Sequence, residues 1–267
     1  FAKDLVVPLG RNLDDHDVVV ASVFPYFPVL AAKLSTIATA TPIVTTWHEV
    51  WGSYWEDYLG HLAPFGTLTE HLTARVPQHP IAVSAVTAER LARIDPDRDH
   101  IRTVPNGIDY EQIRETPPVD QGFDVLFAGR LIADKRVDRL LEAFDRVATP
   151  ETTLGIVGDG PERDELEAHA HRLDSADQIT FVGFLEAYED VLAHMQAARV
   201  FASPSTREGF GLTYVEAMAT GCTVIGADHP DSAADEVVGD GGFLAEPTVA
   251  GVAGVLERVL AGERPPV

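Results

Sequence analysis

The segment 208–218 combines two carboxylates with two glycines and carries the clearest chemical signal in this sequence. It reads Glu-Gly-Phe-Gly-Leu-Thr-Tyr-Val-Glu-Ala-Met. Gly209 and Gly211 lack a Cβ, so backbone N–H groups at the start of the predicted helix can approach a phosphate closely. Glu208 and Glu216 only accept hydrogen bonds, which suits hydroxyl pairs on a sugar or a ribose. Phosphate between two such carboxylates describes a nucleotide-sugar; the alternative is a glycine-capped loop with two solvated glutamates.

A second group of candidate residues follows the predicted strand 124–128. Residues 128–136 read Ala-Gly-Arg-Leu-Ile-Ala-Asp-Lys-Arg. Arginine grips phosphate oxygens in a bidentate manner and lysine adds a compact charge, so Arg130 and Lys135 suit a departing diphosphate. Ordinary loop charge is the alternative. We favour the phosphate interpretation, because this loop holds one of only three lysines, Lys3, Lys33 and Lys135.

Aromatic residues cluster early in the chain. The three tryptophans, Trp47, Trp51 and Trp55, are joined by Tyr54 and Tyr58. On a predicted helix over 50–60, four of these residues share one face. A core position is the favoured interpretation, and a stacking platform for an acceptor glycan or lipid carrier is the alternative.

These residues depend on a regular alternation of predicted strands and helices. Strands are predicted at 17–22, 42–46, 81–84, 101–105, 124–128, 153–157, 178–182, 200–202 and 223–226. Helices are predicted at 29–40, 50–60, 63–74, 85–94, 135–148, 161–173, 187–197, 212–220 and 248–261. Buried strands that alternate with helices predict parallel sheets covered on both faces.

A break at 112–122, which contains Thr116-Pro117-Pro118, divides this pattern. The fold class that we predict is α/β, with two Rossmann-like doubly wound lobes facing a cleft. The first lobe is assigned to residues 1–115 and is expected to be incomplete. The second lobe, assigned to 116–267, is expected to bind the nucleotide-sugar donor.

The composition excludes several classes of protein. The chain has 267 residues and a formal net charge of −22, which disfavours nucleic acid as a partner. Acidity with so little lysine indicates a cytosol of very high salt, and a halophilic archaeal source is our hypothesis. No apolar run is long enough to span a membrane, and Cys222, the single cysteine, excludes an intramolecular disulfide. Asp95, Asp97 and Asp99 imitate a metal motif but are interpreted as an acidic surface turn, so no metal site is predicted.

From about residue 100 onward, the sequence resembles the retaining, GT-B-fold glycosyltransferases of family 4. The resemblance rests on Pro105-Asn106-Gly107-Ile108-Asp109, Gly129-Arg130…Lys135, Gly158-Asp159-Gly160-Pro161, Val182-Gly183-Phe184, and Ser203-Pro204-Ser205…Glu208-Gly-Phe-Gly…Glu216. Order and spacing both agree. The glycine-rich loop after the family's first strand and its closing C-terminal helix are not found here, so we expect a piece of a longer protein.

The resemblance implies roles for individual residues. Glu208 would contact the donor sugar, Glu216 the ribose, and Arg130 with Lys135 the diphosphate. The remaining donor-binding residues that it implies are Phe184, beside the base, and Gly209, Phe210, Gly211 and Leu212, through their backbone groups. Family members carry a histidine after the strand that corresponds to 42–46, so His48 is the candidate to orient the sugar and share a proton.

The expected reaction moves a hexosyl unit from a UDP- or GDP-sugar to a hydroxyl of a glycan or a lipid-linked acceptor, with retention and no required cofactor. Two alternatives stay open: a nucleotide-sugar epimerase of similar architecture, and a non-catalytic lobe that binds nucleotide-sugars. A nicotinamide dehydrogenase is disfavoured, because no Gly-x-Gly-x-x-Gly follows a first strand. We expect a cytoplasmic protein with at most peripheral membrane contact at the inner face.

Overall fold

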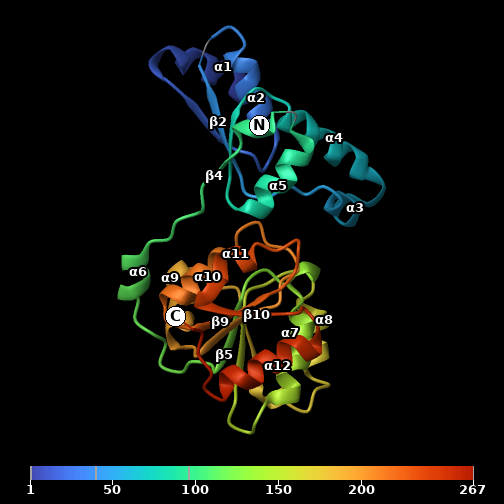
Figure 1. The fold of residues 1–267 in the computed structure, drawn as a ribbon, viewed down its shortest axis with the longest axis vertical. Helices are drawn as coiled ribbons and strands as arrows, with labels where there is room; N and C mark the ends of the chain where they lie inside the picture. Colours follow the sequence, from blue (N-terminus) through green and yellow to red (C-terminus); the bar gives the residue numbers. More distant parts are fainter. Residues whose placement is uncertain (1, 40, 96, 267) are drawn as a thin grey trace. The chain divides into compact units, whose positions relative to one another are not determined.

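The computed structural model describes residues 2–39, 41–95 and 97–266. The chain forms two compact units, Phe1–Asn106 and Gly107–Val267, each with its own parallel sheet (Figure 1). The predicted α/β class with two parallel sheets is confirmed. None of the helices in the described residues has the length and apolarity needed to cross a bilayer.

Unit 1 contains a parallel sheet of order β1-β2-β3-β4. Its strands are β1 (Val19–Ser22), β2 (Ile43–Trp47), β3 (His79–Ala82) and β4 (Arg102–Thr103). Its α-helices are α1 (Ala2–Asn12), α2 (Phe27–Thr36), α3 (Tyr54–Leu59), α4 (Ala63–Ala74) and α5 (Ala85–Ile94), and a 3₁₀ turn, η2 (Gly60–Leu62), joins α3 to α4.

The core of unit 1 is built around aromatic rings. Trp47 and Trp55 are buried there with Tyr26, beside aliphatic residues such as Val29 and Leu91. Helix α5 begins where the sequence favours it, because the hydroxyl of Ser84 accepts a hydrogen bond from the backbone N–H of Thr87 at 3.1 Å.

Unit 2 contains a parallel sheet of order β10-β9-β8-β5-β6-β7. Its strands are β5 (Val125–Ala128), β6 (Leu154–Val157), β7 (Ile179–Gly183), β8 (Val200–Ser203), β9 (Thr223–Ala227) and β10 (Gly242–Ala245). Its α-helices are α6 (Tyr110–Glu115), α7 (Val137–Val147), α8 (Arg163–Ala170), α9 (Tyr188–Ala197), α10 (Leu212–Ala219), α11 (Ala234–Val238) and α12 (Val249–Leu260).

Helices cover both faces of the unit 2 sheet (Figure 1). One buried cluster joins the sheet to α7, α8 and α12, and the other joins it to α6, α9, α10 and α11. Strands β5, β6, β8 and β9 are buried along their whole length. Such two-sided burial explains their continuous apolar sequences.

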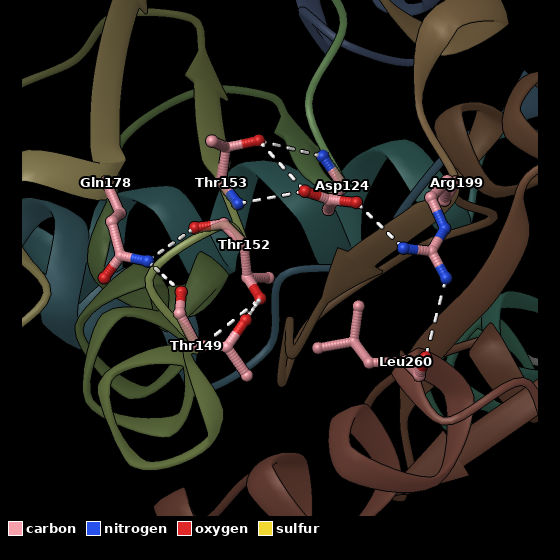
Figure 2. A network of polar contacts seen from close by, with 7 residues as sticks. All are labelled: Asp124, Thr149, Thr152, Thr153, Gln178, Arg199 and Leu260. Carbon is pink, nitrogen blue, oxygen red and sulfur yellow. Dashed lines mark hydrogen bonds and ion pairs between the residues drawn. The ribbon is translucent and has the colours of Figure 1, made fainter.

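The amino ends of the unit 2 strands are joined by a network of polar contacts (Figure 2). Asp124, directly before β5, accepts hydrogen bonds from the backbone N–H and hydroxyl of Thr153 at 3.1 and 3.3 Å. It also pairs with Arg199, directly before β8, at 2.9 Å. Gln178, before β7, donates to the carbonyl of Thr152 at 2.8 Å. This edge of the sheet is therefore tied together internally.

Most predicted elements are present within a few residues of their predicted ends. The pattern missed α1, α6, α11 and β10. Helix α6 begins directly after the predicted motif 105–109 and extends into the predicted break. Asp109, the last residue of the motif, caps it, because its side chain accepts a hydrogen bond from the N–H of Gln112. Strand β10 begins at the last residue of a glycine-rich stretch, 239–242, so its start carries no strand pattern in the sequence.

Candidate functional site

The site residues of unit 2 gather where the strand order of the sheet reverses. From β5 the chain proceeds to β6 and β7 on one side and returns to β8 on the other. Strands β5 and β8 pair only through Val125–Leu126 and Val200–Phe201, so their carboxyl ends are not paired. In open parallel sheets, the crevice beyond such a reversal is the usual ligand site. The loops 129–136 and 204–211 leave the sheet at this point.

Lys135 and Glu208 bring these two loops together. The ammonium Nζ of Lys135 contacts the carboxylate Oε1 of Glu208, across 73 positions of sequence. Their side chains are only 19% and 11% exposed, so the pair is largely withdrawn from water. A lysine ammonium has three N–H donors, and this contact occupies one of them. The sequence placed both residues in one site but did not predict their direct contact.

Backbone hydrogen bonds fix the position of Glu208 further. The N–H of Thr206 donates to the carbonyl of Asp134 at 2.8 Å, which ties the strand β8 loop to the strand β5 loop. The backbone carbonyl of Glu208 accepts a hydrogen bond from the N–H of Ala233 at 3.0 Å. The backbone N–H of Glu208 donates to the carbonyl of Asp231 at 3.3 Å. The carboxylate is therefore held from two sides before any ligand binds.

The amino end of α10 adjoins this pair. Gly211 has a φ of 86°, a left-handed conformation that glycine adopts readily, and the helix starts at the next residue. Phe210 is buried at 8% exposure, whereas Leu212 is 41% exposed. The pKa of Tyr214, inside the first turn, is raised by burial and then by the nearby Glu208 carboxylate. The start of α10 and Glu208 are therefore close together.

Glu216 lies on α10 and is bound by a tyrosine that the sequence did not single out. Its Oε1 accepts a hydrogen bond from the hydroxyl of Tyr188, at the start of α9, at 2.8 Å. Glu216 is 7% exposed and Tyr188 is 42% exposed, so the carboxylate lies just beneath the surface. Burial raises the pKa of Glu216, and the hydrogen bond from Tyr188 lowers it in part. No sequence motif marks Tyr188; only the packing of α9 against α10 identifies it.

The loops after β5, β6 and β7 approach one another through glycines. A Cβ on Gly158 would lie 1.9 Å from the carbonyl oxygen of Gly129, so no larger residue fits there without movement. The N–H of Gly158 donates to the carbonyl of Gly183 at 2.8 Å. Beyond these glycines Phe184 is 70% exposed and Arg130 is exposed. Within the described residues, neither side chain forms a hydrogen bond or ion pair with Lys135 or Glu208.

In unit 1, His48 is exposed and directly follows β2. The loop that begins with it is held by a residue that the sequence did not single out. Glu70 of α4 is fully buried and accepts hydrogen bonds from the N–H of Trp51 at 2.7 Å, the N–H of Gly52 at 2.9 Å and the hydroxyl of Tyr26 at 2.7 Å. The sequence does contain one indication that Glu70 is unusual: no other acidic residue occurs between Asp57 and Glu89.

The aromatic cluster of unit 1 is partly core and partly surface. Trp47 and Trp55 are buried, as the favoured interpretation expected. Trp51 precedes α3, so the predicted helical face does not exist, but its ring still contacts Tyr54, Trp55 and Tyr58. Tyr58 is 62% exposed, and Phe24, stacked on Trp51 at 5.0 Å, is 52% exposed.

No group of three or more His, Cys, Asp or Glu side chains that could hold a metal ion occurs within 2–39, 41–95 and 97–266. Asp95 closes α5, and its side chain accepts a hydrogen bond from the N–H of Asp97 at 2.9 Å. Asp97 in turn pairs with His100 at 2.7 Å. Cys222 is buried directly before β9, and its thiol donates to the carbonyl of Met195 at 3.1 Å.

Comparison with known proteins identifies two matching family models. Residues 109–266 match the model described as glycosyl transferases group 1, and residues 5–112 match glycosyltransferase family 4. The phosphatidyl-myo-inositol mannosyltransferase of Mycobacterium tuberculosis is 30% identical over 76% of this chain and 53% of its own length. The alpha-monoglucosyldiacylglycerol synthase of Streptococcus pneumoniae is 30% identical over 48% of this chain and 33% of its own length.

Solved structures share the fold. Anabaena HepE in complex with UDP and glucose has a TM-score of 0.81 and 22% identity, over 97% of this chain and 72% of its own. The galactosyltransferase WaaB of the lipopolysaccharide outer core, in its apo form, has a TM-score of 0.72 and 23% identity, over 98% of this chain and 72% of its own. The chain spans about half or less of the length of the two curated relatives, the mannosyltransferase and the diacylglycerol synthase.

Proposed function

Because this chain belongs to the glycosyl transferases group 1 family, we propose that it transfers a hexosyl group from a nucleoside diphosphate sugar to an acceptor hydroxyl, with retention of the anomeric configuration. One observation carries the proposal. Lys135 and Glu208, from loops far apart in sequence, meet beside the start of α10 at the reversal of the strand order. That arrangement suits a diphosphate next to a sugar.

The donor would use this site through complementary groups. The N–H donors of Lys135 that do not point to Glu208, together with Arg130 and the start of α10, would bind the diphosphate oxygens. Glu208 would accept hydrogen bonds from the sugar hydroxyls and Glu216 from the ribose hydroxyls. Phe184 would lie beside the base, and the backbone of Gly209, Phe210, Gly211 and Leu212 would border the sugar and phosphate. A UDP- or GDP-sugar meets these requirements.

The reaction breaks the bond between the anomeric carbon and the diphosphate oxygen. Positive charge then develops on the sugar ring and negative charge on the leaving diphosphate. Fixed donors around the diphosphate stabilise this charge, each by about 3 kcal/mol in comparable sites. For retention, the acceptor hydroxyl attacks from the face that the diphosphate leaves, and a leaving phosphate oxygen takes its proton. No additional cofactor is needed in this scheme.

We assign two functions to unit 1, one toward the donor sugar and one toward the acceptor. His48 orients the donor sugar and shares a proton with it, and the exposed rings of Phe24 and Tyr58 offer a surface on which an acceptor sugar can stack. The buried Glu70 supports both functions, because it fixes the loop that runs from His48 to Gly52. A glycan and a lipid-linked sugar are both compatible with this surface.

The first test measures donor binding by the 267-residue chain in molar KCl, with a panel of UDP-, GDP- and ADP-sugars. The cognate donor should raise the melting temperature, because it binds only the folded state. Glu208→Ala should abolish that rise and lower transfer at least about 100-fold. Glu257→Ala, on the exposed face of α12, is the matched control and should change neither.

The outcomes separate the alternatives. Binding with transfer to an acceptor supports the proposal, whereas an epimer formed from donor alone would replace it with an epimerase. Saturable binding without any turnover would leave a binding lobe. We place the protein in the cytoplasm of a halophile, with peripheral contact to the inner face of the membrane. Its net charge of −22 predicts that its melting temperature rises with KCl concentration, because salt screens the repulsion.

A further inference from the structure

Helix α4 of unit 1 places its large apolar residues outward and its small and polar residues inward. Phe65, Leu68 and Leu72 are 69%, 56% and 52% exposed. Their spacing puts them on one helical face. The buried positions of the same helix are Ala63, Gly66, Glu70, Thr73 and Ala74. An ordinary amphipathic helix on a soluble domain shows the reverse arrangement.

The inward face of α4 is fixed and cannot rotate to bury the apolar face. Glu70 accepts hydrogen bonds from two backbone N–H groups and one tyrosine hydroxyl, as described above. Gly66 lies against Trp55 so closely that a Cβ on this glycine would be 2.2 Å from the indole ring. Turning the helix would break these hydrogen bonds and drive larger residues into Trp55. The outward apolar face is therefore a fixed property of unit 1.

The apolar surface extends beyond α4. Helix α3 packs against α4 and contributes Tyr58, which is 62% exposed, and the η2 turn contributes Leu62, which is 46% exposed (Figure 1). Alongside lies a groove of about 510 Å³. Its lining includes both leucines of α4, Pro64, His71, Arg75 and Glu56 of α3. We call Tyr58, Leu62, Phe65, Leu68 and Leu72 the α4 face.

Charge around the α4 face differs from the rest of this acidic chain. The chain has 42 acidic residues, yet between Asp57 and Glu89 the sole acidic residue is the buried Glu70. The other titratable groups here are His71 on the helix and Arg75 directly after it. A surface that must approach anionic headgroups favours such groups over carboxylates. On α4 itself the described carboxylate is buried, and the exposed carboxylates near the face, Glu56 and Asp57, lie on α3. This local loss of acidity favours a lipid surface over an aqueous one.

We propose that the α4 face inserts into the boundary between headgroups and acyl chains of a lipid bilayer and holds the protein at the membrane. The interaction is chiefly burial of apolar side chains, with Tyr58 at headgroup level. Because the whole chain carries −22, dilute salt opposes binding to anionic lipid, and molar salt removes that repulsion by reducing the Debye length to about 3 Å. Binding should therefore strengthen with salt, whereas docking through basic clusters weakens with salt.

The test is flotation of the 267-residue chain with phosphatidylcholine vesicles, with and without phosphatidylglycerol, in dilute and in molar KCl. The chain should float in molar KCl with both lipid mixtures. In dilute KCl it should float less with phosphatidylglycerol. The double variant Phe65→Ser with Leu68→Ser should reduce binding at least about tenfold, because two large apolar side chains no longer enter the bilayer.

The matched control is the double variant Leu34→Ser with Ile37→Ser. These two residues are 60% and 67% exposed in the same unit, at the end of α2, and should affect binding less than about twofold. Equal losses in the two double variants, or no flotation of the unsubstituted chain in molar KCl, would overturn the proposal. So would a dimer in sedimentation that only the Phe65 and Leu68 changes dissociate, because a second copy would then cover the face.

A second measurement reports the environment of the α4 face directly, without measuring how much protein floats with the vesicles. Cys222 is the sole cysteine and is buried, so Phe65→Cys introduces an accessible position for a polarity-sensitive dye. The emission of that dye should shift to the blue when vesicles are added in molar KCl. A dye at Leu34→Cys should not shift. Shifts of equal size at both positions would contradict insertion through α4. Donor binding should be unchanged in all these variants, so failure here is distinct from failure of the proposed transfer.

Discussion

At the amino ends of the unit 2 strands, polar side chains bind one another and neighbouring backbone. Asp124 accepts hydrogen bonds from Thr153 and pairs with Arg199, and these contacts join the amino ends of β5, β6 and β8 (Figure 2). At the carboxyl ends of the same strands, Lys135 contacts Glu208, but Arg130 and Phe184 extend outward and glycines replace side chains. At the amino ends the polar side chains are therefore engaged with one another. At the carboxyl ends, polar and aromatic side chains remain exposed to a ligand.

This difference indicates how one sheet serves two purposes. Side chains at the amino ends form hydrogen bonds and ion pairs with one another. They contribute to stability, and few of their donors and acceptors remain for a ligand. Groups at the carboxyl ends are held by backbone contacts of their loops, so their side chains can exchange partners when a ligand arrives. Substitutions at the two edges should therefore separate effects on stability from effects on transfer.

The largest expected effect is on transfer, at the carboxyl edge. Lys135→Ala should lower the rate of transfer about 100- to 1,000-fold, because an ammonium next to the leaving diphosphate is lost. Steady-state assays in molar KCl measure this effect, and circular dichroism checks the fold. Arg199→Ala at the amino edge is the control and should leave the rate unchanged. Similar rates for the two variants would show that the edges do not differ in function.

Close backbone approach at the carboxyl edge should make Gly158 intolerant of a side chain. Gly158→Ala should lower the free energy of unfolding by about 2–4 kcal/mol, because its φ is 127° and the new Cβ would meet the Gly129 carbonyl. Chemical denaturation measures the change. Gly254→Ala in α12 meets nothing within 4 Å and should stabilise by up to about 1 kcal/mol. A neutral Gly158→Ala would mean that the loops are not closely packed.

At the amino edge we expect a loss of stability without a loss of function. Asp124→Ala removes hydrogen bonds to Thr153 and the pairing with Arg199, and should lower the free energy of unfolding by about 1–2 kcal/mol. The exposed Arg199 pairing contributes little of this. Denaturation and transfer assays on the same preparation measure both quantities. A slower transfer at unchanged stability would contradict a structural function for this network.

The smallest expected effect concerns Glu216. Burial of its carboxylate lowers stability, whereas the same carboxylate is proposed to bind the donor. Its raised pKa means that the unfolded chain releases this proton at lower pH than the folded protein does. The carboxyl is neutral in both states in acid, and its burial becomes costly as pH rises through the raised pKa. Glu216→Gln should therefore stabilise the protein at pH 7 by roughly 1 kcal/mol, and the gain should vanish below about pH 4.

The same substitution should weaken donor binding, because a neutral amide accepts hydrogen bonds less strongly than a carboxylate. Titration calorimetry with the cognate donor measures this loss. Glu246→Gln, a glutamate outside the site, is the control. An increase in stability at pH 7 without weaker donor binding would remove Glu216 from the proposed site and leave it as a buried structural residue.

Local sequence signals predicted the elements that carry the site. The strand predicted at 124–128 is β5, Val125–Ala128, and the helix predicted at 212–220 is α10, Leu212–Ala219. Apolar runs and glycine positions involve residues close together in the chain, so they can be interpreted without knowledge of the fold. The helix predicted at 50–60 instead begins at Tyr54, because Glu70 binds the N–H groups of Trp51 and Gly52 and holds them outside the helix.

By itself the sequence established the alternation of strands and helices, the two parallel sheets, and the position of Glu208 and Glu216 around the start of a helix. These follow from the spacing of residues close together in the chain. The fold alone determined that Lys135 contacts Glu208, that Tyr188 binds Glu216 and that α4 turns its apolar face outward. Each of those contacts depends on how separate segments pack, which no local pattern encodes.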